Sequence, residues 1–362
     1  MSTAQRQFEA RGTVPAVTST LVRGEPEAGE TPPSLTSRLF AIRTLASLGI
    51  AVVIVAVAVW RAQIDWGAAW DNIRHANPLL YLAALAVYYT SFVVRSVRWQ
   101  VLLGNAGEQQ RSRSLIGIVI TSFFVNCVVP AKMGDIYRAY LAKQKLEVPV
   151  SKALGTIIAE RLIDLIVLMS LLLAAGAVVF RTKAPGILIP YVIIGVVACL
   201  AGVGVILVMR AGRGQRILRL LPEAVFHRYE SLRLGTVDSF ARLPTLLALT
   251  LLVWAAEGTR LGLVVFSLHL AGVHLGPSQF LLIALVAALL TTVPFLPGGL
   301  GLVEAGMIGV LITVGGVSNS AAVSITLLDR SISYASLIVI GFVIFIFTHI
   351  HVPKARRIAT QG

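Results

Sequence analysis

Apolar segments close to membrane-spanning length recur along most of the chain, and they constrain the fold more than any other feature. They fall at about residues 39–60, 78–103, 114–130, 134–146, 152–180, 187–209, 243–270, 277–296, 299–314 and 319–348. Hydrophobic residues make up 56% of the sequence and charged residues only 13%, which is outside the range of soluble domains. The sequence therefore predicts an all-α polytopic membrane protein.

Two of these apolar stretches, 114–146 and 277–314, are interrupted by proline, glycine and a carboxylate. The interruptions are Pro130–Asp135 and Pro297–Glu304, and each is followed about 30 residues later by an acidic-arginine dipeptide, Glu160-Arg161 or Asp329-Arg330. A helix breaker in hydrocarbon leaves backbone groups unpaired unless protein or a wet cavity satisfies them. Paired breaks in the two halves of a membrane protein indicate a transport site.

The distribution of lysine and arginine in the loops predicts the topology. The connector 210–242 is basic, and so is the tail after residue 352, so both are expected in the cytoplasm, whereas the loops 271–277 and 315–320 carry no Lys or Arg and are expected outside. Each broken stretch then enters and leaves on one face. We expect about six full transmembrane helices plus two oppositely oriented re-entrant hairpins, where simple hydropathy would give seven or eight spans. A minority of basic residues conflicts with this scheme: Arg61, Arg74, Arg181 and Lys183.

Three regions follow from composition. Residues 1–37 are rich in Thr, Ser, Pro, Gly and Glu and are predicted to be a disordered cytoplasmic tail. Residues 38–352 form the transmembrane domain, whose first apolar run is interpreted as a retained signal anchor, and 353–362 form a short basic tail. The formal net charge of +14 indicates contact with anionic lipid rather than nucleic acid, because the charges are dispersed among membrane segments.

An internal repeat is predicted between residues 78–180 and 243–348. Its landmarks recur at offsets of 162, 167 and 169 residues; they pair Arg95 and Arg98 with Glu257 and Arg260, Pro130 with Pro297, and Arg161 with Arg330. Three full crossings separate the two broken units, so the repeats would be inverted, which is a transporter architecture.

Charged residues within the apolar segments need partners or an aqueous cavity. Spacing predicts pairs on one helical face between Asp135 and Arg138 and between Glu257 and Arg260. Such pairs can also serve packing alone. We interpret Arg95 and Arg98 in that way, because the adjacent Trp99 suggests a membrane interface where arginine snorkels. The candidate substrate-binding residues are Asn126, Lys132, Gly134, Asp135, Arg138, Glu160, Arg161, Asp164, Glu257, Arg260, Pro297, Gly298, Gly299, Gly301, Glu304, Asp329 and Arg330.

These residues suit a phosphate-bearing ligand. Half-helices that begin near Gly134 and Gly301 would present free backbone amides to an anion, and Arg138, Arg161 and Arg330 would add charge. The six histidines lack metal-ligand spacing and no catalytic constellation is apparent, so no metal and no cofactor is expected. Cys127 and Cys199 lie in apolar runs and are interpreted as small core residues.

Four runs resemble the transmembrane, flippase-like domain of lysylphosphatidylglycerol synthases. They are Val94–Trp99, Asn126–Arg138, Glu160–Asp164 and Pro297–Glu304, and the resemblance covers roughly residues 40–350. In bifunctional members this domain is implied to move an aminoacylated phospholipid across the bacterial inner membrane, and a separate soluble domain makes that lipid. Lys132 stands where the resemblance leads us to expect Arg, so the charge is kept but not the bidentate fork.

The resemblance implies a stand-alone lipid translocase of the bacterial cytoplasmic membrane, with both termini in the cytoplasm. Its partners would be membrane lipids with an anionic or lipid-linked headgroup, and no nucleic acid. Two alternatives stay open. One is an integral-membrane enzyme on lipid-linked substrates with Asp135 or Glu304 as general base. The other is an accessory subunit for a separate synthase or glycosyltransferase, docked on the connector 210–242, whose arginines more simply indicate an amphipathic lipid-surface helix.

Overall fold

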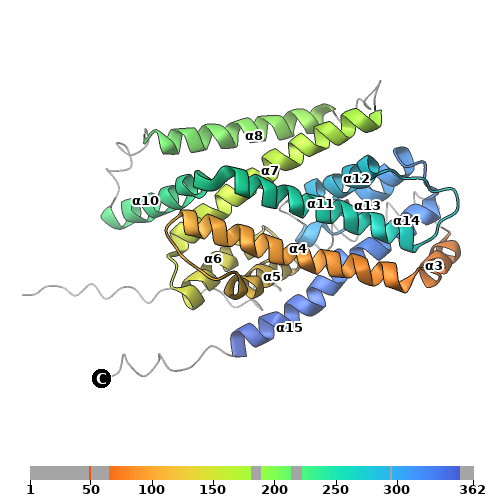
Figure 1. Cartoon of the computed structure of the whole chain (residues 1–362), viewed down its shortest axis with the longest axis horizontal. Helices are drawn as coiled ribbons and strands as arrows, with labels where there is room; N and C mark the ends of the chain where they lie inside the picture. The colour runs from red at the N-terminus through yellow and green to blue at the C-terminus, as the bar shows by residue number, and fades with distance from the viewer. Residues whose placement is uncertain (1–48, 50–64, 181–188, 213–221, 294–295, 351–362) are drawn as a thin grey trace, which may run out of the picture. The chain divides into compact units, whose positions relative to one another are not determined.

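The computed structural model describes residue 49 and residues 65–180, 189–212, 222–293 and 296–350, and every regular element in these ranges is helical (Figure 1). The all-α class is therefore confirmed. The predicted tails, the signal anchor and most of the amphipathic stretch after Arg210 lie outside the described residues. The elements are α3 Trp66–Arg74, α4 Pro78–Asn105, α5 Ser112–Val128, α6 Met133–Leu146, α7 Val150–Phe180, α8 Ile189–Arg210, α10 Glu223–Asp238, η2 Ser239–Arg242, α11 Leu243–Ser267, α12 Pro277–Thr291, η3 Pro297–Gly299, α13 Leu302–Thr313, α14 Asn319–Arg330, the π-helix η4 Ser331–Ser336 and α15 Leu337–Ile350.

Four helical stretches are long and apolar enough to cross a membrane: Pro78–Asn105, Val150–Phe180, Val225–Ser267 and Asn319–Phe347. The first, second and fourth coincide with predicted spans, and α8 coincides with another. The third contains the predicted span 243–270 but begins at Val225, so helix extends into the connector predicted over 210–242. The described side chains of α8 are largely exposed and apolar, as at Val197 and Leu200, which suits contact with lipid tails. The chain is a multi-pass membrane protein.

Local sequence explains where α4 begins. Asn77 precedes the helix, and its Oδ1 accepts hydrogen bonds from the backbone N–H groups of Leu79 and Leu80. Pro78 occupies the first helical position, where a missing N–H costs nothing. The polar-proline pair therefore sets the start of a helix that packs along α11 (Figure 1).

Both predicted breaks are present, and each lies between two short helices that pack against each other. The arms α5 and α6 have 17 and 14 residues, and α12 and α13 have 15 and 12, all shorter than the about 20 residues that crossing a bilayer requires. The second break is longer than expected, because α12 ends at Thr291 rather than at 296. Pro294 explains the earlier end, since the residue before a proline is disfavoured in the helical conformation.

A π-helical turn, η4, separates α14 from α15 inside the last predicted span. The wider turn is held from α4: the Tyr88 hydroxyl donates to the Ser333 carbonyl oxygen at 2.9 Å, and Tyr89 shares a 2.9 Å hydrogen bond with the Ser336 hydroxyl. Such single π turns are frequent at functional sites because they shift the side chains that follow. Here the shift places Tyr334 against the second break.

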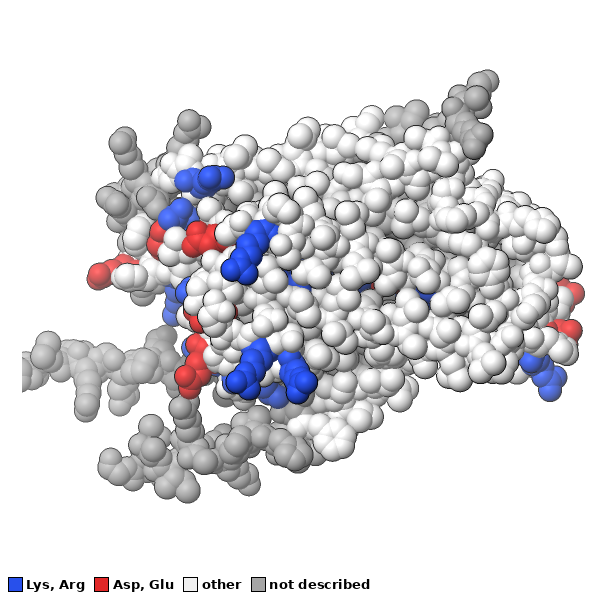
Figure 2. All heavy atoms as spheres, viewed as in Figure 1, with Lys and Arg blue, Asp and Glu red and all other residues white. Residues whose placement is uncertain are grey.

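The charges on the molecular surface agree with a membrane protein. On the face drawn in Figure 2, Lys, Arg, Asp and Glu atoms gather at the end where α10, α5 and α6 lie and at the opposite end near α3, and the surface between them is almost free of charge. Beneath this surface α10 packs on α7, and α3 packs on α14. In the described part of the chain, the arginines and carboxylates that the sequence places within the apolar segments are all buried or partly buried.

Candidate functional site

A cavity of about 240 Å³ lies among α4, α7, α11, α12, α14 and the two breaks. Its apolar wall includes Phe123, Trp254 and Ala287, and its polar wall is unusually rich in ionisable groups for a site inside apolar helices. Those groups are Arg95, Lys132, Arg161, Asp164, Glu257, Arg260, Asp329 and Arg330.

The structure brings about half of the predicted site residues together around this cavity. Nine of the predicted site residues line the cavity: Asn126, Lys132, Arg161, Asp164, Glu257, Arg260, Gly298, Asp329 and Arg330. The remaining predicted residues do not line it; they are Gly134, Asp135, Arg138, Glu160, Pro297, Gly299, Gly301 and Glu304. Most of this second group hold the breaks or the cavity arginines in place, as their contacts show.

The first break closes on itself through Asn126. The Asn126 side-chain oxygen accepts the Gly134 N–H at 2.8 Å, while Ala131 and Lys132 both adopt left-handed backbone conformations, with φ of 64° and 53°. A side chain at Gly134 would collide with the Ser122 carbonyl oxygen, so glycine is needed for α5 and α6 to approach. Two successive left-handed non-glycine residues are a strained arrangement of the kind that persists at functional sites.

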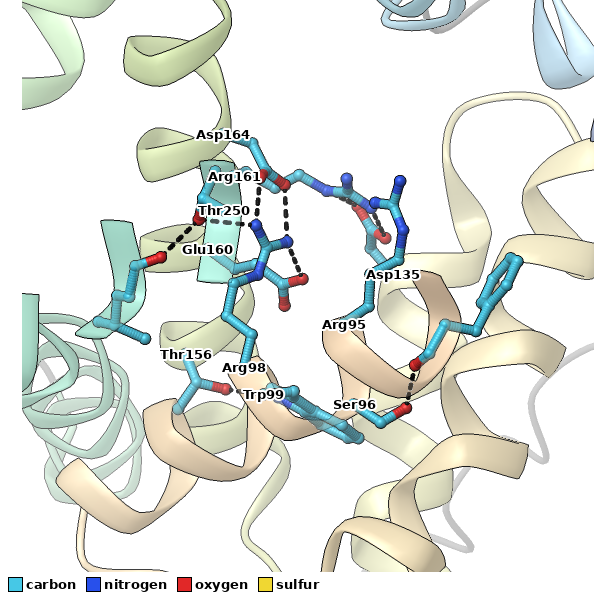
Figure 3. Close-up of polar contacts among 12 residues, drawn as sticks. Arg95, Ser96, Arg98, Trp99, Asp135, Thr156, Glu160, Arg161, Asp164 and Thr250 are labelled. Carbon is cyan, nitrogen blue, oxygen red and sulfur yellow. Dashed lines mark hydrogen bonds and ion pairs between the residues drawn. The ribbon is translucent and has the colours of Figure 1, made fainter. Parts of the chain in front are cut away.

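Arg161 on α7 reaches across to the first break. Its Nε and Nη2 donate to the two Asp135 oxygens at 2.9 and 2.6 Å, a bidentate pair between helices (Figure 3). Asp135 is therefore not the partner of Arg138, and the pair predicted from their three-residue spacing is wrong. The corresponding prediction for Glu257 and Arg260 is confirmed, at 3.1 Å.

The second break is arranged in a similar way. One Glu304 oxygen accepts the Gly301 N–H at 2.6 Å and the other accepts the Arg330 Nε–H at 2.6 Å. Arg330 also donates to the Gly298 carbonyl oxygen at 3.1 Å, and Gly298 has φ of 55° with Tyr334 so close that no side chain would fit. The expectation of free amides at the half-helix starts is thus wrong for Gly134 and Gly301, because Asn126 and Glu304 already occupy them.

The two breaks carry matched ion pairs. Asp135–Arg161 and Glu304–Arg330 each join residues 26 positions apart, and each has a closest distance of 2.6 Å. Both pairs recur at the offset of 169 residues that the predicted internal repeat requires. The second pair is the more enclosed, since the Arg330 side chain is 11% exposed and that of Arg161 is 34% exposed.

Between the breaks, Glu257 connects the two halves. It accepts from Arg95 of α4 at 2.9 Å and from Arg260 of its own helix at 3.1 Å, and Arg260 in turn pairs with Asp329 of α14. Arg95 also lies over the Phe123 ring, 5.1 Å from its centroid. Sequence reasoning left Arg95 out of the site, although its repeat counterpart is Glu257, and that correspondence was the signal that could have found it.

A buried charge cluster lies beside the cavity and is centred on Arg98 (Figure 3). Arg98 is 1% exposed and donates to Asp164 at 2.5 Å and to Glu160 at 2.7 Å. Glu160 also pairs with Arg138 at 2.9 Å, and the Arg138 guanidinium stacks 3.9 Å from the Trp99 ring centroid. The expectation that Arg98 snorkels at a membrane interface beside Trp99 is wrong, because both side chains are buried among the helices. The interpretation that Arg98 serves helix packing agrees with its ion pairs to α7.

Arg138 belongs to this cluster and not to the cavity lining. Arg138 is 1% exposed and does not line the cavity, so in this structure it does not meet a ligand there. Its contacts with Glu160 and Trp99 instead fix α6 against α7 and α4. Besides Arg95, the sequence analysis also did not predict the aromatic residues that line the cavity, which are Tyr88, Phe123, Trp254 and Tyr334. Aromatic residues are common in apolar helices, so only the folded structure shows that these four lie together.

The fold and the cavity define a polytopic membrane protein with a charged internal site. Its sequence matches the model of the lysylphosphatidylglycerol synthase transmembrane region over residues 46–341, and the chain belongs to that family.

Similar proteins include the UPF0104 membrane protein MJ1078 of Methanocaldococcus jannaschii, 30% identical over 241 residues, which cover 65% of this chain and 98% of that protein. The UPF0104 membrane protein PH1989 of Pyrococcus horikoshii is 24% identical over 316 residues, covering 79% and 91% respectively. Glycosyltransferase AglD of Haloferax volcanii is 25% identical over 332 residues, covering 81% of this chain but 53% of that protein. These relatives are archaeal, so a bacterial location stays a prediction.

Proposed function

We propose that this protein moves a lipid with a phosphate-bearing headgroup between the two leaflets of the membrane, through the cavity between the two broken hairpins. The observation that carries the proposal is the cavity itself, which places five basic and three acidic side chains among membrane helices. Charges at membrane depth are costly and mark pathways for polar groups. Broken helices in corresponding halves mark the binding site of many transporters.

The cavity arginines supply the chemistry for a phosphate. Arg161 and Arg330 each hold a carboxylate at one end of the cavity, and a guanidinium fork binds phosphate oxygens with the same geometry. An incoming headgroup would replace Asp135 or Glu304 as the partner. Each arginine then passes from a protein carboxylate to the ligand without losing its charge compensation, which keeps the barrier to binding low.

We further propose that the two hairpins are re-entrant from opposite faces, so that each leaflet has its own entrance. The short arms of α5, α6, α12 and α13 support this, as does the absence of Lys and Arg from the loops 271–277 and 315–320. In this arrangement the membrane is the cytoplasmic membrane and both termini face the cytoplasm.

Cysteine labelling tests the topology. In a background with Cys127 and Cys199 replaced by alanine, Gly316→Cys is expected to react with an impermeant maleimide added outside intact cells. Glu147→Cys is the matched control, because it is also exposed and also has a left-handed backbone, with φ of 60° against 62° at Gly316. It should react only after the cells are opened. Labelling of Gly316→Cys only from the inside would contradict the opposed hairpins.

Lipid movement in proteoliposomes tests the function. Purified wild-type protein alone is expected to carry fluorescent phospholipid from the inner to the outer leaflet, where dithionite quenches it. Mass spectrometry of lipid retained through purification should identify the natural headgroup class. Failure to move any phosphate-bearing lipid, including the retained one, would contradict the proposal.

A second candidate function is an enzyme that acts on a lipid-linked substrate. It is favoured by one observation, the similarity to a protein named as a glycosyltransferase, although the chain spans about half of that protein. Sugar transfer from a nucleotide sugar to a lipid acceptor by the purified chain would support the enzyme. Lipid movement without turnover would support the translocase.

A further inference from the structure

The arginines and carboxylates around the cavity match one to one. Six arginines can be assigned to six different carboxylates, each pair within 4.0 Å. The pairs are Arg161 with Asp135, Arg330 with Glu304, Arg260 with Asp329, Arg95 with Glu257, Arg138 with Glu160 and Arg98 with Asp164. Together these six pairs contribute no net charge, so the net charge of the site is set by the charged residues outside them.

Among the described residues, Lys132 is the basic or acidic residue of the cavity lining that belongs to none of these six pairs. Among the described residues it has no carboxylate oxygen within 4.0 Å, although it lines the same cavity as Arg161 and Asp164. Its side chain is partly buried, so solvent only partly screens the ammonium group. The cavity therefore carries one uncompensated positive charge, and that charge belongs to Lys132.

The backbone at Lys132 indicates that this placement is built into the break. Lys132 and the preceding Ala131 both have positive φ, and Asn126 secures the turn by accepting the Gly134 N–H. A turn held in this way fixes the position of the Lys132 backbone at the cavity wall, from which the side chain extends. Strained backbone of this kind persists where the surrounding structure enforces it.

We propose that the headgroup this protein handles is singly anionic, a phosphodiester, and that Lys132 is the residue that selects its charge. This inference rests on the proposed function and narrows its substrate class. A phosphodiester brings one negative charge and leaves the loaded cavity neutral. A zwitterionic headgroup would leave the lysine uncompensated, a cationic aminoacyl headgroup would add a second positive charge, and a diphosphate would leave an excess of negative charge.

The proposal sets a charge order for transport. In vesicles of phosphatidylcholine, acyl-labelled phosphatidylglycerol should cross at least about tenfold faster than acyl-labelled phosphatidylcholine or lysyl-phosphatidylglycerol, a ratio equivalent to about 1.4 kcal/mol. Equal rates for the three lipids, or a faster rate for the lysyl lipid, would overturn the assignment.

Variants of Lys132 test the residue. Lys132→Met, which keeps an unbranched side chain one atom shorter and removes the charge, should bring the rate ratio of phosphatidylglycerol to phosphatidylcholine close to one. Lys132→Arg should keep the ratio. Lys152→Met is the matched control, because Lys152 pairs with Glu108 at 2.8 Å and does not line the cavity. An unchanged ratio in Lys132→Met would overturn the role of Lys132, and the wild-type order tests the charge class even if that variant fails to fold.

Binding separates the failure of this inference from that of the proposed function. In detergent, phosphatidylglycerol should raise the unfolding temperature of the wild-type protein more than phosphatidylcholine does, whether or not lipid crosses vesicles. If phosphatidylglycerol stabilises the protein more but no lipid crosses the vesicles, the result would support the charge assignment and contradict the proposed lipid translocation. Equal stabilisation by water-soluble glycerophosphoglycerol would keep the phosphodiester and contradict a lipid substrate, and no difference between the two lipids would contradict the charge assignment.

Discussion

Replacement of Arg161 by glutamine is expected to reduce lipid movement at least about 100-fold, the effect of losing about 3 kcal/mol of headgroup binding in the transition state. Arg161 is the most exposed of the cavity arginines that hold a carboxylate, with 34% of its side chain accessible, and it carries a bidentate fork. Glutamine keeps some hydrogen bonding but has no charge to exchange between Asp135 and a phosphate. Initial rates in proteoliposomes, at equal amounts of folded protein, measure the effect.

The control for this prediction is Arg233→Gln. Arg233 also pairs with a carboxylate, Glu230 at 2.5 Å, but on α10 and away from the cavity. It should transport at the wild-type rate. Glu304→Ala should resemble Arg161→Gln, because it removes both the partner of Arg330 and the acceptor for the Gly301 N–H. Wild-type transport by folded Arg161→Gln would contradict the role given to the arginine.

Arg98→Met is expected to destabilise the protein by about 3–5 kcal/mol, the usual effect of removing one partner of a buried charge pair. Arg98 is 1% exposed and its guanidinium donates to Glu160, Asp164 and Thr250, so it joins α4 to both α7 and α11. Without it two carboxylates stay buried with fewer donors. The unfolding temperature in detergent should fall by at least about 5 °C.

Two further variants separate charge from packing in this cluster. Arg233→Met removes an ion pair on α10 and should change the unfolding temperature little. The double variant Arg98→Met, Asp164→Asn also removes one of the two carboxylates and leaves the Arg138–Glu160 pair intact, so it should recover part of the loss. An unfolding temperature within about 1 °C of wild type for Arg98→Met would show that the cluster does not support the helix packing.

The helices and the breaks were predictable because they depend on local chemistry. Apolar runs long enough to cross a membrane almost always form helices. Pro297, Gly298 and Gly299 interrupt such a helix. The end of α12 was placed too late because hydropathy carried the segment across Pro294, a residue that itself explains the helix end.

The partners of the charges were less predictable. Spacing along one helix correctly predicted the pair Glu257–Arg260 but also predicted the pair Asp135–Arg138, which is not formed. It cannot predict a pair such as Asp135–Arg161, whose residues are 26 positions apart and lie on different helices. Such pairs depend on which helices become neighbours. The repeat was the better guide, because an offset of 169 residues relates both carboxylates and both arginines of the matched pairs.

The burial of individual charged side chains was the property that the sequence predicted least well. Arg98 beside Trp99 has the composition of a membrane interface, yet both side chains lie at the centre of the packing, because acidic residues of α7 and Thr156 accept their hydrogen bonds. Conversely, Arg138 has the position of a ligand-binding residue in sequence but is enclosed by Trp99 and Glu160. A charge near a break is therefore not by itself a cavity residue.

The most direct test of the account is the rate of lipid movement when the cavity alone is filled. Ala287 lines the cavity on α12, and its neighbour Val286 does not. In proteoliposomes we expect rapid movement of phosphatidylglycerol by the wild-type protein and by Val286→Trp, and a rate at the protein-free background for Ala287→Trp. Undiminished movement by Ala287→Trp, or no movement by the wild-type protein, would contradict a lipid pathway between the two broken hairpins.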